Sequence, residues 1–147
     1  MERLVSVQDV WQLPATMVNE AQLIRVLLVE DEFLISEMVA ETLSRQGFSV
    51  RTVTNGADAL QYLTSAPVDV LFTDINLPGG MDGMALARRA RDLLPELPVV
   101  YASGGVNMFD FAWGVPRSIS VAKPYDPDVI GRVLLSAMKT ATARLSA

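Results

Sequence analysis

The chain has 147 residues and a mass of 16.0 kDa, the size of one ordinary domain with a buried core. Half of its residues are hydrophobic and a fifth are charged, which excludes global disorder. The net charge of −5 argues against nucleic-acid binding, and no apolar run reaches the length needed to cross a bilayer. Without a recognisable secretory signal, the expected location is the cytoplasm.

The sequence contains neither cysteine nor histidine. The lack of cysteine excludes disulfides and thiolate metal sites. The lack of histidine removes the commonest general base and the commonest nitrogen ligand for zinc. Any chemistry must therefore use carboxylates, hydroxyls, lysine or a hard cation.

The first third of the chain alternates between short apolar runs and stretches of helical periodicity. Ile24–Val29 is a nearly continuous apolar run, typical of a strand buried on both faces of a parallel sheet. Phe33–Arg45 then has apolar residues at helical spacing, and Gly47 is placed to end that helix. A second strand is predicted over Phe48–Val53, with a helix after the Asn-Gly pair at 55–56.

The same alternation continues to the C-terminus. We predict strands over Val68–Thr73, Leu97–Ala102 and Ile119–Ala122, and helices over Met84–Leu94, Val106–Trp113 and from Asp126-Pro127 onward. Strict alternation predicts a three-layer α/β domain, a (βα)5 arrangement around a five-stranded parallel sheet. We expect the flavodoxin-like strand order 2-1-3-4-5, in which ligands lie beyond the carboxyl ends of the strands.

Side chains able to act on a phosphate or a cation follow four of these strands. Glu30 and Asp31 follow the first strand, Asp74 the third, Ser103 the fourth and Lys123 the fifth. The topology should bring them to one rim, where carboxylates about 4 Å apart repel by roughly 4 kcal/mol at an effective dielectric near 20. Three acids beside one lysine therefore require a cation. Oxygen ligands alone favour Mg²⁺ or Mn²⁺ over zinc, and one carboxylate stays available as a nucleophile.

The segments VLLVEDE, LFTDINLPGGMDG, YAS and AKPY stand in this order along the chain. Together they resemble the four signature segments of bacterial response-regulator receiver domains, over roughly Ile24 to Leu145. The resemblance implies a switch of a two-component or phosphorelay system that catalyses its own phosphorylation, and because no output domain fits after Leu145 we expect a stand-alone receiver. It also implies a sensor histidine kinase or histidine phosphotransfer protein as phosphodonor, and an unknown downstream protein.

The resemblance also implies a role for each rim residue. Asp74 matches the phospho-acceptor, and Glu30 and Asp31 match the acidic pair that binds Mg²⁺ together with Asp74. The backbone carbonyl of Asn76 would complete the protein's share of the metal ligands.

Two more matches concern the phosphoryl group itself. Ser103 matches the switch hydroxyl and Lys123 the lysine that pairs with the phosphoryl group. Pro124 matches the proline that often follows through a cis bond, which only X–Pro bonds adopt at low cost.

The rim residues also have ordinary structural interpretations. Glu30 and Asp31 could cap the next helix, Asp74 could bond within its own loop, Lys123 could be a solvated loop lysine, and Ser103 could be a helix cap. Their ordered spacing favours the functional interpretation. The Asp-Gly pair at 82–83 is predicted to cap the helix that follows it.

Two other function classes stay open. The chain could be a receiver-shaped interaction module that is never phosphorylated. It could also be a small aspartate-based phosphatase, although that class needs a second acid two residues after Asp74, where this chain has Asn76.

Three departures from the receiver pattern concern switching. Ser103 stands where many receivers have threonine, and Ser120 stands where an aromatic residue is usual. We hypothesise that Tyr101, or an aromatic residue of the 109–113 cluster, takes over part of the missing ring's role. The loop at 78–80 is also one residue longer than usual.

Residues 1–22 lie outside the resemblance, so we predict an N-terminal extension followed by a receiver domain over 23–145. The extension is rich in apolar residues. It either stays mobile or packs on the domain or on a second copy, which leaves a homodimer open.

Overall fold

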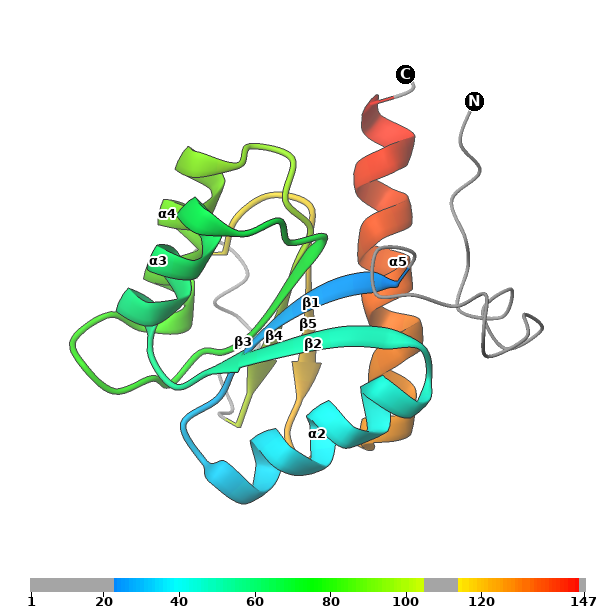
Figure 1. The fold of residues 1–147 in the computed structure, drawn as a ribbon. Helices are drawn as coiled ribbons and strands as arrows, with labels where there is room; N and C mark the ends of the chain where they lie inside the picture. The colour runs from blue at the N-terminus through cyan, green and yellow to red at the C-terminus, as the bar shows by residue number, and fades with distance from the viewer. Residues whose placement is uncertain (1–22, 105–113, 146–147) are drawn as a thin grey trace.

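A computed structural model of the chain describes residues 23–104 and 114–145. This part of the chain forms a central sheet with helices on both faces (Figure 1). The strands are β1 (Ile24–Val29), β2 (Phe48–Val53), β3 (Val70–Asp74), β4 (Val99–Ser103) and β5 (Ser118–Ala122). The helices are α2 (Phe33–Arg45), α3 (Gly56–Ser65), α4 (Gly83–Leu93) and α5 (Pro127–Leu145).

The strand order is β2-β1-β3-β4-β5, and every neighbouring pair is parallel. The predicted α/β class, flavodoxin-like fold and strand order are therefore confirmed. The helix predicted over Val106–Trp113 and the extension predicted over 1–22 lie outside the described residues. None of the described helices combines the length and the apolar character needed to cross a lipid bilayer.

Two hydrophobic cores lie on opposite faces of the sheet. Helices α2 and α5 cover one face, and α3 and α4 cover the other (Figure 1). Along β1, Val26 and Leu28 contribute to the first core, whereas Leu27 and Val29 contribute to the second. This alternation explains why β1 is apolar at every one of these positions, because both of its faces are buried.

The helix ends follow from local side-chain chemistry. Asn55 caps α3 by accepting a hydrogen bond from the Asp58 amide at 2.8 Å. Asp82 caps α4 in the same way, accepting from the Ala85 amide at 2.7 Å, as predicted. Gly47 lies just beyond α2 with a φ of 94°, a conformation that favours glycine.

Both ends of β3 and β4 and the start of β5 differ from the prediction by one or two residues. A strand was predicted over Val68–Thr73, but β3 starts later because the Asp69 carboxylate binds both the amide and the guanidinium of Arg25, at 2.7 Å and 3.0 Å. Strand β3 instead continues to Asp74. Strand β4 begins after Pro98, which has no amide hydrogen to donate.

Candidate functional site

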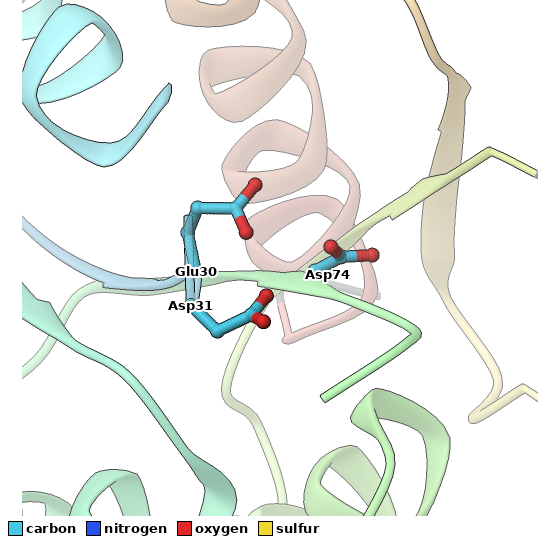
Figure 2. A group of neighbouring side chains, drawn as sticks. All are labelled: Glu30, Asp31 and Asp74. Carbon is cyan, nitrogen blue, oxygen red and sulfur yellow. The ribbon is translucent and has the colours of Figure 1, made fainter. Parts of the chain in front are cut away.

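Three carboxylates meet at the carboxyl ends of β1 and β3. The strands pair so that Val29 lies beside Thr73, which brings the next residues, Glu30 and Asp74, level with each other. Figure 2 shows the carboxylates of Glu30, Asp31 and Asp74 gathered in one region. Each offers an oxygen within 4.8 Å of the others. The sheet register therefore brings together acids that lie more than 40 residues apart in the sequence.

The three acids differ in exposure. Glu30 and Asp74 are 3% and 7% exposed, whereas Asp31 is exposed. Burial raises the pKa of Glu30, and this effect outweighs the lowering by the Glu32 amide, 3.2 Å away, and by the charge of Lys123. Ionising Glu30 in this site therefore costs free energy, which a further cation would reduce.

Lys123 brings a positive charge to the acids from the end of β5. Its Nζ atom lies 2.6 Å from Asp74 Oδ2 and 3.4 Å from Glu30 Oε1. Burial acts to lower the pKa of Lys123, but the hydrogen bond to Asp74 and the charges of both acids raise it overall. The ammonium group therefore stays charged at neutral pH. The Lys123-Pro124 peptide bond is cis.

Ser103 and Asn76 lie close to Asp74 in the backbone, Ser103 at the end of the neighbouring strand and Asn76 in the loop after β3. Ser103 ends β4, one residue beyond Ala102, which pairs with Asp74. The Ser103 carbonyl accepts a hydrogen bond from the Lys123 amide at 2.8 Å. The Asn76 amide donates to Asp74 Oδ1 at 3.2 Å. The structure thus places all six residues singled out in the sequence at one end of the sheet.

The start of α4 packs directly against the Asp74 backbone, a contact that the sequence did not reveal. A Cβ atom added at Gly83 would overlap the carbonyl oxygen of Asp74. The Gly83 amide donates to the Ile75 carbonyl at 2.7 Å, and Thr73 Oγ1 donates to the Asp74 carbonyl at 2.9 Å. The Asp-Gly pair at 82–83 therefore positions Asp74 as well as capping the helix.

Tyr125 is a second neighbour that sequence reasoning missed. Its ring packs against Phe72 with the centroids 5.7 Å apart. Burial, followed by the charge of Glu30, raises the pKa of its hydroxyl to about 12. The only signal in the sequence was its place in the AKPY segment, where no role was given to it.

The donor set of this site fits a hard divalent cation. Glu30, Asp31 and Asp74 each offer a carboxylate oxygen within 4.8 Å of the others, and Asp31 is exposed to water. Mg²⁺ is usually bound by one or two carboxylates and keeps several waters or phosphate oxygens in its other positions. In the described part of the chain these three side chains form the acidic group arranged to hold a metal.

Residues 26–134 match the family model of the response regulator receiver domain. The response regulator receiver protein CpdR of Brucella abortus is 38% identical over 80 residues, which cover 54% of this chain and 66% of that protein. The transcriptional regulatory protein CseB of Streptomyces coelicolor is 32% identical over 121 residues, 81% of this chain and 49% of that protein. The chain thus spans between half and two thirds of these relatives.

A solved structure agrees with both matches. The crystal structure of a response regulator receiver protein from Sinorhizobium medicae has a TM-score of 0.77 and 31% sequence identity, covering 82% of this chain and 98% of that chain. It therefore shares the fold over nearly all of the described residues. Since sequence and structure point to the same relationship, we conclude that this chain belongs to the response regulator receiver domain family.

Proposed function

We propose that this chain is a signalling switch that accepts a phosphoryl group on Asp74 in the presence of Mg²⁺. The observation that supports this most strongly is the position of Asp74 itself. Its carboxylate is buried, 2.6 Å from the Lys123 ammonium and within 4.8 Å of oxygens of both Glu30 and Asp31. An acceptor flanked by a cation on one side and a metal-binding acid pair on the other is arranged for phosphoryl transfer.

The reaction is a displacement at phosphorus. A carboxylate oxygen of Asp74 attacks the phosphorus of a phosphohistidine, a P–O bond forms and the P–N bond breaks. The histidine leaves with the electron pair and takes up a proton, and Asp74 becomes an acyl phosphate. Lys123 is placed to pair with the phosphoryl oxygens during this transfer.

Glu30, Asp31, Asp74 and the backbone carbonyl of Asn76 would hold the metal. When bound, Mg²⁺ supplies positive charge that offsets the charge on the transferred phosphoryl group. That charge would also offset the cost of burying the carboxylates of Glu30 and Asp74. Mn²⁺ prefers similar oxygen ligands and is the expected substitute.

The output would arise at the end of β4. A phosphoryl group adds about −1.5 to −2 charges and three strong acceptor oxygens. Ser103 ends β4 beside the Asp74 backbone partner, so a turn of its hydroxyl toward these oxygens would displace the end of the strand. The changed surface would then be read by a downstream protein.

The phosphodonor would be a sensor histidine kinase or a histidine phosphotransfer protein. Large apolar side chains are exposed at the start of α2, directly after the acid pair: Phe33 is 72%, Leu34 80% and Met38 51% exposed. An apolar surface of this kind next to a reactive carboxylate favours a protein as donor.

Labelling with acetyl phosphate and Mg²⁺, followed by intact-mass measurement, tests the acceptor. We expect one added phosphoryl group on the full chain and none on Asp74→Asn. Asp82→Asn is the matched control, because it makes the same chemical change in the same loop and asparagine caps helices as well as aspartate does. If neither acetyl phosphate nor a phosphohistidine protein gives an adduct, the chain is better described as an interaction module.

Removing the metal tests the acid pair. We expect a chelator, Glu30→Gln or Asp31→Asn to abolish or strongly slow the labelling, because each removes the metal or one of its ligands. Glu32→Gln, at an exposed neighbouring position, should label at the normal rate. A labelling rate unaffected by chelation would show that Glu30 and Asp31 have another role.

A further inference from the structure

Tyr101 lies in the middle of β4, two residues before Ser103, and is only 2% exposed. Its backbone partner in β5 is Ser120. Ile119 and Val121 point to the α2–α5 side of the sheet, so Ser120 points to the same side as Tyr101. Tyr101 and the smaller Ser120 are therefore neighbours on the same face of the sheet.

The Tyr101 hydroxyl reaches the segment that leads into β5. It accepts a hydrogen bond from the Val115 amide at 3.1 Å, in a buried position. A Cβ atom at Gly114 would lie 3.3 Å from the tyrosine ring, so glycine lets the backbone approach the ring closely. The Val115 carbonyl is also held, accepting from Ser118 Oγ at 2.7 Å. Tyr101 is thus a tertiary link between β4 and the Gly114–Val115 backbone.

The segment on the far side of this link is anchored to α4. Arg91 of α4 donates to the carbonyl oxygens of Pro116 and Arg117, at 2.8 Å and 3.3 Å. The same guanidinium donates to the Leu97 carbonyl at 2.6 Å, just before β4. Arg117 also forms an ion pair with Glu96 at 3.0 Å. The start of β4 and the segment before β5 are therefore held together, independently of the carboxyl half of β4.

We propose that the Tyr101 hydroxyl transmits phosphorylation of Asp74 to the Gly114–Val115 backbone. Tyr101 and Ser103 flank Ala102, the backbone partner of Asp74, so all three lie on the half of β4 that would move when Ser103 turns to the phosphoryl group. Because Arg91 fixes the other side, this movement loosens the bond between Tyr101 and the Val115 amide. The inference rests on the proposed function and makes Tyr101 a positioning residue, which touches neither donor nor metal.

Amide hydrogen exchange, read by NMR on the full chain, tests this link. The two states compared are the protein with Mg²⁺ alone and with Mg²⁺ plus beryllofluoride, a stable phosphoryl analogue. We expect the Val115 amide to exchange about fivefold faster with the analogue, which corresponds to the loss of one hydrogen bond of about 1 kcal/mol. The Asn76 amide, bonded to Asp74, reports independently that the site is occupied.

Variants separate transmission from simple stabilisation. In Tyr101→Phe we expect fast Val115 exchange in both states with no further change, while the Asn76 amide still responds. Tyr62→Phe removes the same hydroxyl from a tyrosine on α3 that stacks with Arg51, and it should behave like the unaltered chain. A general loss of stability in Tyr101→Phe would act on both states equally and cancel in their difference.

Three outcomes would overturn the inference in distinguishable ways. If Asn76 responds but Val115 of the unaltered chain does not, the link carries no signal, although Asp74 labelling stands. A Val115 response that persists in Tyr101→Phe would also reject the role of the hydroxyl. If Asn76 does not respond and acetyl phosphate gives no adduct, the proposed function fails and this inference fails with it. The unaltered chain alone decides the first and third cases if the variant does not fold.

Discussion

At the scale of single residues, Lys123 balances the charge of two buried acids. Its removal would leave Glu30 and Asp74, at 3% and 7% exposure, facing each other without a cation. We expect Lys123→Ala to lower the free energy of unfolding by about 2 kcal/mol without metal, and by less with Mg²⁺. Urea titration at both conditions measures this.

Lys139→Ala, at an exposed position of α5, is the control and should change stability by less than about 0.5 kcal/mol. An equal loss of stability in the two variants, or a loss in Lys123→Ala that Mg²⁺ does not reduce, would contradict the view that Lys123 and a metal both neutralise the buried acids.

Glu30 is expected to lower the stability of the metal-free protein. Burial raises its pKa above the ordinary value of 4.5, so the folded state binds this proton more tightly than the unfolded state. The resulting stabilisation is full below pH 4.5 and is lost as the pH rises through the raised pKa. Glu30→Gln should therefore be more stable than the unaltered chain at pH 7 without metal, and should lack this part of the pH dependence.

Thermal unfolding of both proteins from pH 4 to pH 8 makes this comparison. Mg²⁺ should reduce the difference in stability between the two proteins, because it binds and stabilises the folded unaltered chain. A Glu30→Gln variant that is less stable at pH 7 would mean that the contact with Lys123 outweighs burial.

Sequence reasoning found the charged residues of this site and named Tyr101 as a candidate for the missing ring's role, but it gave no role to Tyr125. An acid after a buried strand is unusual enough to stand out, because a carboxylate is expensive to bury without a partner. In the sequence Tyr125 looks like an ordinary core residue, and nothing there shows which atom the Tyr101 hydroxyl contacts. Their importance depends on what the hydroxyl reaches, and for Tyr101 that is the amide of Val115, which only the tertiary structure reveals.

At the scale of secondary-structure elements, the contact between α4 and β3 predicts that substitutions of two nearby glycines, Gly83 at the start of α4 and Gly79 in the loop before it, have very different costs in stability. Gly83 has no room for a methyl group beside the Asp74 carbonyl, so Gly83→Ala should cost about 3 kcal/mol or more and slow Asp74 labelling. Gly79 has a φ of 88° but open space around it, so Gly79→Ala should cost only about 1 kcal/mol and leave labelling unchanged.

Chemical denaturation and the acetyl phosphate assay, carried out on the same two variants, give both readouts. Similar losses in both would indicate that backbone conformation, and not the packing of α4 on β3, determines the role of Gly83.

The elements themselves were predictable, but their ends less so. The alternation of apolar and helical periodicity located every described strand and helix. The predicted start of β3 was too early. Both the amide of Asp69, which donates to the Arg25 carbonyl at 2.9 Å, and its carboxylate bind Arg25 just before the strand begins. This interaction joins residues 44 positions apart, so nothing in the local sequence indicates where the strand begins.

At the scale of the whole molecule, both cores and all five described strands are built from residues after 22. We therefore predict that a chain starting at residue 23 unfolds within about 1 kcal/mol of the full chain and labels Asp74 at the same rate. Denaturation, labelling and sedimentation of the two forms test this. A larger loss, or a change from dimer to monomer, would show that residues 1–22 pack on the domain or on a second copy.

The topology was predictable because few arrangements satisfy strict strand–helix alternation with right-handed crossovers. Convergence of the acids and Lys123 followed from that topology alone. The connection between β4 and the segment before β5 could not be predicted from the topology. It depends on Arg91, whose guanidinium reaches three backbone carbonyls.

Arg91 also affects which part of this protein is expected to unfold locally first. Among the described strands β5 pairs with β4 alone. The backbone just before β5 is held by side-chain contacts of Arg91, Tyr101 and Arg117 instead of a second neighbouring strand. Local openings detected by hydrogen exchange should therefore begin at the edge strands, β5 among them, while β1, β3 and β4, each paired on both sides, open last. Asp74 ends β3 and the acids Glu30 and Asp31 follow β1, whereas Tyr101 lies on β4, next to the edge strand β5.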